Sequence, residues 1–152
     1  MRMLIILLAA AAAASPALAQ DKAKGLPLKD LPAAVQKAIQ DNLKGAEIKN
    51  IEKEKEGGVV QYEVETMLNG KSRDFDVDTK GALLEIEEAA TMDVVPAAAQ
   101  AAIQKKIADG KLTSIETVTK TGQPPMYEAG YTDKKGKKHE FLVKADGTEV
   151  KD

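Results

Sequence analysis

The strongest constraint on the fold is a strict alternation of apolar and polar residues within positions 61–86. Tyr62 and Val64, and then Phe75 and Val77, alternate with acidic residues. Alternation with a period of two is typical of β-strands that have one buried and one solvated face. An Asn-Gly pair separates the two runs, and this dipeptide favours the positive φ angles of a two-residue hairpin turn. The stretch therefore predicts antiparallel strands joined by tight turns.

The order of motifs in the first half of the chain returns in the second half. Residues 95–103 (VPAAAQAAI) match residues 31–39 (LPAAVQKAI), and both segments place apolar residues at helical spacing after a proline. Further on, Phe141 corresponds to Phe75 after two single-residue insertions in the turns. A duplicated structural unit produces such a pattern. We predict an α+β fold of two tandem repeats, each an α-helix packed on a four-stranded antiparallel β-sheet.

The repeat also predicts which aromatic rings lie in the core, and where one strand is irregular. Tyr62, Phe75, Tyr127 and Phe141 are paired between the repeats, so all four are expected to be buried. Ile48 and its next apolar neighbour are three positions apart, which breaks strict alternation. Ile48 is therefore expected either at the entry to a strand or beside a β-bulge.

The first 19 residues have the features of a secretory signal peptide. A basic start precedes an apolar run over residues 4–14, and Ala17-Leu18-Ala19 is a small-x-small cleavage pattern. The apolar run is too short to cross a bilayer, although an uncleaved anchor is the alternative. Residues 20–28 are polar and read as a flexible leader. Because the chain contains no cysteine, no disulfide stabilises it after export.

Charge is distributed unevenly after the predicted signal peptide. Residues 20–89 contain 11 Lys and Arg against 15 Asp and Glu, whereas residues 90–152 contain 10 against 9. Neither half is basic enough to indicate a nucleic-acid partner. Arg73 is the only arginine in this part of the chain, which also argues against bidentate phosphate recognition.

These motifs resemble the PepSY-like unit. The resemblance rests on Leu-Pro-x-x-Val-x-x-Ala-Ile at 31–39, Tyr-Glu-Val-Glu at 62–65 and Phe-x-Val-Asp-x-x-Gly at 75–81. The chain is similar to exported bacterial proteins described as beta-lactamase-inhibitor-like (BLIP-like), which carry two such units after a signal peptide. The resemblance implies a periplasmic, non-enzymatic binding or inhibitory role. The predicted organisation is a signal peptide, a flexible leader and two PepSY-like repeats, at residues 1–19, 20–28, 29–89 and 90–152.

Four carboxylates of the first repeat are a candidate cation-binding set. Asp74, Asp76, Asp78 and Glu85 fall at positions 1, 3, 5 and 12 of a calcium-binding loop. Position 6 of such a loop needs Gly for a sharp bend, and here it is Thr79. A solvated strand face is therefore the alternative, and we expect no resident metal or cofactor.

A second candidate site lies on the predicted last hairpin. Tyr131 has no aromatic counterpart in the first repeat, and His139 is expected beside it across the turn. Lys135 and Lys137 belong to the tip of the same hairpin. Interfaces favour an aromatic residue beside a histidine, and the lysine-bearing tip would suit an acidic face of a partner or of another copy. Tyr131, His139, Lys135 and Lys137 therefore form the candidate partner-binding set. The alternative is that the ring fills a local gap and the lysines keep the turn soluble.

Catalysis finds little support in the sequence. His139 is the only histidine, and neither Ser72 nor Ser114 has a nucleophile-elbow pattern around it. We therefore predict a non-catalytic periplasmic or secreted module that recognises a protein partner, for example a secreted peptidase or another cell-envelope enzyme. The alternative function is binding of a small ligand or divalent cation by the acidic face of repeat 1. A homodimer is left open, and no membrane span is expected after signal cleavage.

Overall fold

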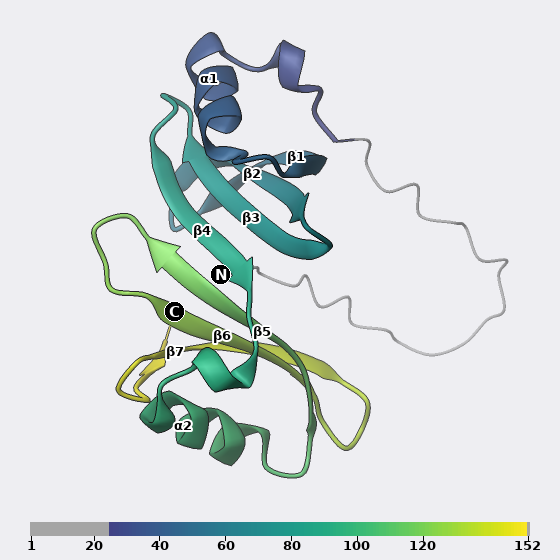
Figure 1. Cartoon of the computed structure of the whole chain (residues 1–152), viewed down its shortest axis with the longest axis vertical. Helices are drawn as coiled ribbons and strands as arrows, with labels where there is room; N and C mark the ends of the chain where they lie inside the picture. Colours follow the sequence, from purple (N-terminus) through teal and green to yellow (C-terminus); the bar gives the residue numbers. More distant parts are fainter. Residues whose placement is uncertain (1–24, 152) are drawn as a thin grey trace, which may run out of the picture.

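The computed structural model describes residues 25–151, so the predicted signal peptide and part of the leader lie outside the described residues. The helices are η1 (Leu28–Asp30), α1 (Ala33–Asn42), η2 (Met92–Val94) and α2 (Ala97–Ile107) (Figure 1). The strands are β1 (Glu47–Glu56), β2 (Val59–Leu68), β3 (Lys71–Asp78), β4 (Leu83–Ala89), β5 (Lys111–Lys120), β6 (Met126–Thr132), β7 (Lys138–Lys144) and β8 (Glu149–Val150).

All eight strands form one sheet, in the order of the sequence, with each strand antiparallel to its neighbours. The predicted α+β class is confirmed. The four strands predicted for each repeat belong to one continuous sheet, because β4 pairs with β5 from Glu85↔Lys120 to Ala89↔Glu116. This pairing removes two sheet edges whose backbone N–H and C=O groups would otherwise lack strand partners.

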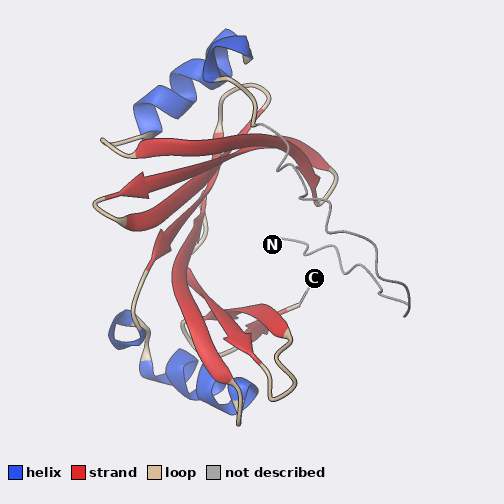
Figure 2. Cartoon of the chain, turned by 90° about the vertical axis from the view of Figure 1, so that its right-hand side faces the viewer, coloured by secondary structure: helices blue, strands red, loops and turns tan. Residues whose placement is uncertain are grey.

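The sheet is bent into an arch, and both α-helices lie on its outer side (Figure 2). On that side, α1 covers a core built on the first half of the sheet, and α2 covers a second core on the other half. The four aromatic rings predicted to be core are all buried, namely Tyr62, Phe75, Tyr127 and Phe141. The inner side of the arch carries no helix of residues 25–151 (Figure 2).

Matching irregularities support the duplication. The register of β1 against β2 shifts between Ile48 and Asn50, and the register of β5 against β6 shifts between Leu112 and Ser114. The two shifts are therefore 64 residues apart, the offset at which the helices match. The bulge predicted beside Ile48 is confirmed, and it has an equivalent in the second half.

Two turn glycines touch the helices in the same way. Gly81 has a φ of +85°, and a Cβ added there would lie 2.5 Å from the carbonyl oxygen of Ala34 in α1. Gly147 has a φ of +84°, and its added Cβ would lie 2.7 Å from the carbonyl oxygen of Ala98 in α2. Only glycine allows both this backbone conformation and this close approach. Each turn is thereby held against the first turn of its helix.

Candidate functional site on the inner face of the sheet

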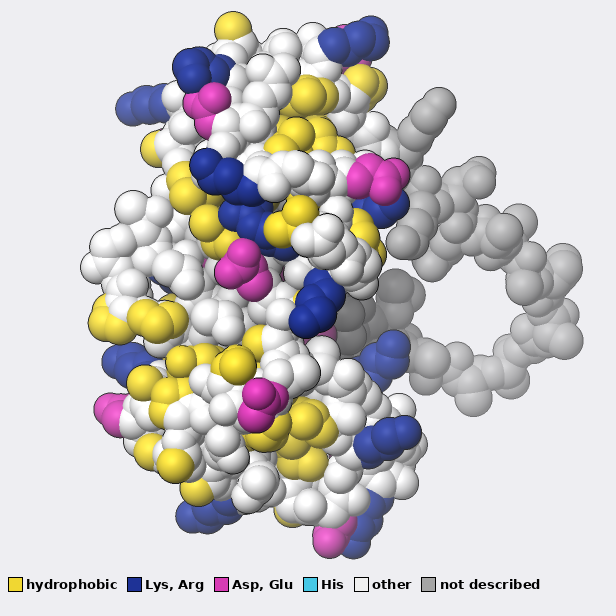
Figure 3. Space-filling model, in the orientation of Figure 1, with side chains coloured by type: hydrophobic (Ala, Val, Ile, Leu, Met, Phe, Trp, Pro, Cys, Tyr) yellow, Lys and Arg dark blue, Asp and Glu magenta, His cyan; other side chains and the backbone are white. Residues whose placement is uncertain are grey.

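The inner face of the sheet differs between its two halves. Core residues alternate with inner-face residues along each strand, so the inner side chains follow from the buried positions. In the first half these side chains are mostly acidic: Glu52, Glu54, Glu56, Glu63, Glu65, Asp74, Asp76, Glu85 and Glu87. The side of the molecule seen in Figure 3 instead shows acidic groups scattered singly. Negative charge is therefore concentrated on the inner face of β1–β4.

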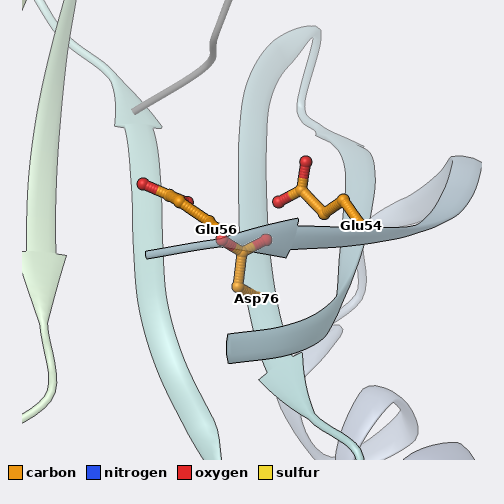
Figure 4. Close-up of side chains that lie close together, drawn as sticks. All are labelled: Glu54, Glu56 and Asp76. Atoms are coloured by element: carbon orange, nitrogen blue, oxygen red, sulfur yellow. The ribbon is translucent and has the colours of Figure 1, made fainter. Parts of the chain in front are cut away.

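Three of these carboxylates, Glu54, Glu56 and Asp76, lie close together (Figure 4). They surround the buried amide of Gln61, and we call these four residues the carboxylate cluster. Gln61 Nε2 lies 2.9 Å from Glu54 Oε1, 3.2 Å from Glu56 Oε2 and 2.8 Å from Asp76 Oδ2. One carboxylate oxygen of each acid lies within 4.8 Å of the others. The amide nitrogen, a hydrogen-bond donor, thus lies among the three oxygens.

Asp76 is the titrating group of the carboxylate cluster. Burial raises the pKa of Asp76, and the negative charges of Glu63, Glu54, Glu85 and Glu56 raise it further, to about 7. Burial acts this way because it disfavours the charged form, and neighbouring like charges add to the effect. Asp76 therefore changes its charge near neutral pH, unlike an ordinary aspartate.

Only three of the four predicted cation-binding residues share one cavity. Asp74, Asp76 and Glu85 line a small cavity of about 20 Å³ on the inner face. Asp78 lies outside it, and its Oδ1 accepts two backbone N–H groups of the following turn, both at 2.8 Å. Those hydrogen bonds, the one from Ala82 foremost, lower the pKa of Asp78. The structure thus gives Asp78 a turn-forming contact rather than a place in the cavity.

The other two residues of that set also have protein partners. Asp74 accepts the backbone N–H of Thr66 at 2.8 Å and the hydroxyl of Ser72 at 2.9 Å. Glu85 pairs with Lys120 of β5 at 3.0 Å. Cation binding by Asp74, Asp76, Asp78 and Glu85 stays a prediction. The grouping around Gln61 draws two of its three carboxylates from β1 instead.

In the second half of the inner face, apolar residues occupy the places equivalent to Glu54, Gln61 and Asp76, whereas Lys120 stands at the place of Glu56. The equivalence follows from strand pairing. Glu54 pairs with Gln61 in the first repeat, as Val118 pairs with Met126 in the second. Asp76 pairs with Glu85 in the first repeat, as Leu142 pairs with Val150 in the second. Val118, Met126 and Leu142 are buried together, with Val150 packed against them. The same position in the fold is therefore ionic in one repeat and hydrophobic in the other.

The structure brings Tyr131 and His139 together on the helix-bearing side of the sheet. Their rings stack with centroids 5.0 Å apart and planes at 20°, and Tyr131 also meets Phe141 edge-on at 5.8 Å. His139 Nε2 lies 3.0 Å from Asp133 Oδ2. Both Tyr131 and His139 are half-buried.

Lys135 and Lys137 lie on the exposed hairpin tip, as the sequence predicts. Their backbone N–H groups donate to Asp133 Oδ1 at 2.8 and 2.9 Å. Both residues are exposed. The tip borders a groove of about 310 Å³ against the turn that follows α2. The four predicted partner-binding residues therefore occupy one end of the second repeat, with a half-buried part and an exposed part.

Sequence reasoning missed Gln61, Glu54 and Glu56. Gln61 interrupts an otherwise acidic set, and its burial depends on three strands meeting around it. The two-residue turn at Gly57-Gly58 sets the register that brings the end of β1 opposite Gln61. Alternation after the bulge does place Glu54 and Glu56 on one face, and that was the available signal.

None of the helices within residues 25–151 is long and apolar enough to cross a membrane.

Several solved structures share the fold. One from Bacteroides eggerthii, described as a periplasmic protein, has a TM-score of 0.64 at 18% identity and covers 80% of this chain and 86% of that one. A DUF2874 family protein from Bacteroides ovatus has a TM-score of 0.61 at 13% identity, covering 80% and 85%. A BLIP-like protein from Bacteroides fragilis has a TM-score of 0.57 at 18% identity, covering 83% and 85%.

The family comparison is consistent with these structures and with the resemblance seen in the sequence. No curated protein matches the chain. A family model described as "Putative beta-lactamase-inhibitor-like, PepSY-like" matches residues 18–85 and, in a second and overlapping segment, residues 60–133. Together these segments cover most of the chain, and the chain belongs to this beta-lactamase-inhibitor-like, PepSY-like family.

Proposed function

We propose that the protein is a non-catalytic periplasmic module that binds a partner protein through the acidic inner face of β1–β4. The observation that carries the proposal is the arrangement of the sheet, which has both α-helices on one side (Figure 2). Carboxylates are concentrated on the other side. Its structural neighbours, described as periplasmic and as BLIP-like, support an exported binding or inhibitory role.

The chemistry of the inner face indicates what kind of partner fits. Glu52 is exposed, and Glu54, Glu56, Glu63 and Glu65 are half-buried with part of their surface open. Charged groups of one sign select a partner of complementary charge and accelerate its association. The partner segment is therefore basic, such as a Lys- or Arg-bearing loop of a secreted peptidase or another cell-envelope enzyme.

The predicted hairpin set is the second contact region of the proposal. Tyr131 and His139 form a stacked pair beside the groove, and Lys135 lines the groove itself. Lys137 lies at the exposed tip next to it. Aromatic side chains next to flexible cationic ones suit a contact at the edge of an interface. This end of the molecule would meet an acidic part of the same partner or of a second copy.

The alternative function, binding of a small ligand or cation by the acidic face, has less support. The cavity of about 20 Å³ holds roughly one water molecule. The Gln61 amide nitrogen already lies among the three nearest carboxylate oxygens. A cation would have to displace that donor before it could collect the six or more oxygen ligands that calcium requires.

The proposal is tested by charge reversal on the inner face, with a matched reversal elsewhere. The double variant Glu52→Lys/Glu65→Lys should recover its crosslinked partner from periplasmic extract about tenfold less than the wild type, or about 1.4 kcal/mol. The control Asp30→Lys/Asp41→Lys makes the same charge change at two exposed positions in η1 and α1, away from the inner face and from the hairpin groove. Equal recovery by both double variants would remove the inner face from the proposal.

The hairpin contact has its own test. Tyr131→Ala should weaken binding of the recovered partner, while far-UV circular dichroism shows an unchanged fold. Unchanged affinity in a folded Tyr131→Ala variant would remove this residue from the interface and leave the inner-face proposal intact.

A further inference from the structure

We propose that the edge of β7 on the side away from β6 binds one extended strand of a partner protein. The strand pairs antiparallel with β7 beside His139, Glu140 and Phe141, and so continues the sheet. It carries an apolar residue opposite Phe141 and an acidic residue opposite His139. This site goes beyond the proposed function, because it does not involve the inner face of β1–β4.

Comparison of the two repeats shows that β7 lacks part of a neighbouring strand. In the first repeat, β4 pairs with five positions of β3, from Val77↔Leu83 to Arg73↔Glu88. In the second repeat, β8 pairs with two positions of β7, and Lys151 follows β8 without belonging to a strand. Within residues 25–151, no strand pairs on this side with the three positions of β7 that remain, namely Phe141, Glu140 and His139.

The backbone of Glu140 directs its hydrogen-bonding groups toward this edge. The N–H of Lys144 donates to the carbonyl oxygen of Thr148 at 2.9 Å, so Lys144 bonds on the side of β8. Along an antiparallel strand the bonding direction alternates from residue to residue. Glu140 and Lys138 therefore face the same side as Lys144, and no strand among the described residues lies opposite them. Such edge groups are a template for a further strand.

An apolar side chain fits the position opposite Phe141. In the first repeat, Ile86 stands opposite Phe75 and packs against the core beneath α1, and Phe75 is 1% exposed. Phe141 is 8% exposed and has no strand residue opposite it within residues 25–151. The ammonium group of Lys106 lies 5.8 Å from its ring centroid instead. An apolar residue of a bound strand would cover this ring as Ile86 covers Phe75.

The first repeat also indicates the charge two positions further along the strand. Glu88 stands opposite Arg73, and Arg73 Nε donates to Glu88 Oε1 at 3.1 Å. His139 takes the place of Arg73, and its Nε2 lies 3.0 Å from Asp133 Oδ2. A protonated imidazole donates from both ring nitrogens, which leaves Nδ1 for a second acceptor. An acidic residue of a bound strand therefore suits the position opposite His139.

The other edge of the sheet, β1, does not suit this position in a second copy. In the register that puts Ile51 of a second copy opposite Phe141, the next two pairs would join like charges, Glu52 with Glu140 and Lys53 with His139. Like charges directly opposite each other destabilise a strand pair. In addition, the N–H of Leu26 already donates to the Ile51 carbonyl at 2.8 Å. The occupant is therefore a strand of a different protein.

The proposal is tested with the capped hexapeptide Ser-Ile-Lys-Glu-Glu-Thr and the full chain. In antiparallel pairing its Ile, Lys and first Glu lie opposite Phe141, Glu140 and His139. In nitrogen-15 NMR spectra near pH 6, millimolar peptide should shift the amide signals of residues 138–141 until they saturate. The Glu140 N–H should then exchange with solvent at least about threefold more slowly. The absence of shifts, or shifts confined to β1–β4, overturns the proposal.

Two control peptides separate strand pairing from attraction between side chains. Methylation of the lysine amide nitrogen keeps the charge and removes the N–H that would bond to the Glu140 carbonyl, so binding should weaken at least about fivefold. Ser-Ile-Glu-Lys-Glu-Thr has the same composition but places like charges opposite Glu140 and His139, and it should bind at least about threefold more weakly. Equal binding of either control overturns the proposal.

Protein variants locate the site. Glu140→Pro removes the N–H at the open edge and should weaken binding about as much as the methylated peptide, because proline is tolerated where an edge N–H faces solvent. Glu140→Ala keeps the N–H and should stay within about twofold of the wild type. Tight binding by a folded Glu140→Pro variant overturns the proposal. Broadening of the same amides with rising protein concentration, without peptide, would assign the edge to a second copy and also overturn it.

The charge-reversal variant of the inner face distinguishes this site from the proposed function. Glu52→Lys/Glu65→Lys should bind the hexapeptide as the wild type does, because both substitutions lie on β1 and β2 at the other end of the sheet. Loss of peptide binding in this variant would place the peptide on the inner face and overturn the edge site. Failure to recover a partner through the inner face leaves the peptide result unaffected.

Discussion

Transplanting the apolar residues of the second repeat into the first should stabilise the protein at high pH. The triple variant Glu54→Val/Gln61→Met/Asp76→Leu gives three of the four cluster positions the residues of the other half (Val118, Met126 and Leu142) and keeps Glu56. The sheet already accepts this set of side chains at the equivalent places. The variant therefore tests both the equivalence of the repeats and the cost of the charges.

The expected size follows from Asp76, whose pKa rises from 3.8 to about 7 on folding. Each pKa unit corresponds to about 1.4 kcal/mol, which sets a ceiling of about 4 kcal/mol. Because the Asp76 carboxyl is partly open to solvent, we discount this to about 2 kcal/mol. The folded pKa lies above the unfolded value, so the stability contribution is complete below about pH 4 and is lost as the pH rises through about 7.

The assay is urea unfolding followed by circular dichroism near pH 5 and near pH 8. This range covers about two thirds of the interval between the two pKa values, so the wild type should lose about 1 kcal/mol more of its free energy of unfolding than the triple variant does. A variant that loses as much as the wild type would refute the assignment of the pH dependence to the cluster. A variant that fails to fold near pH 5 would refute the equivalence of the two inner-face positions.

Three further predictions concern the fold and the alternative function. Gly81→Ala should cost about 2 kcal/mol more than Gly58→Ala in urea unfolding, because both glycines have positive φ but only Gly81 approaches a helix carbonyl; equal losses would contradict the contact. Arg73→Gln should cost about 2 kcal/mol, since the buried guanidinium donates at 2.8 Å to the Asn42 carbonyl at the end of α1; a loss under about 0.5 kcal/mol would show that this contact is unimportant. Calcium in millimolar excess should leave the melting temperature unchanged, because the Gln61 amide lies among the carboxylates; a clear rise would restore the cation-binding alternative.

Much of the fold was accessible from local patterns. Alternation around Tyr62 and Phe75 predicted strands with a buried face, and the 64-residue repeat transferred that assignment to the second half. The pairing of β4 with β5 was not accessible in this way. Two strands with polar inner faces can end two sheets or join into one, and alternation is the same in both cases.

The candidate site was predicted less well, for a related reason. The calcium-loop spacing counts positions along one strand and into the next, which joined Asp78 to Asp76. Contacts on a sheet are decided by register across strands, and the register at this end of β1 follows from the turn at Gly57-Gly58. Glu54 and Glu56 consequently reach Asp76, while the carboxyl of Asp78 serves its own turn. The stacking of Tyr131 on His139 needed only one hairpin, and the sequence did predict that proximity.

The different inner faces of the two repeats bear on the direction in which a bound segment would lie. Two repeats with identical inner faces would offer two nearly equivalent binding sites, so a bound segment could lie in either direction along the arch. Here the first repeat presents carboxylates and the second presents packed aliphatic side chains, so the two directions of binding are not equivalent. The difference between Asp76 and Leu142 thus gives the pseudo-symmetric inner face two chemically distinct ends.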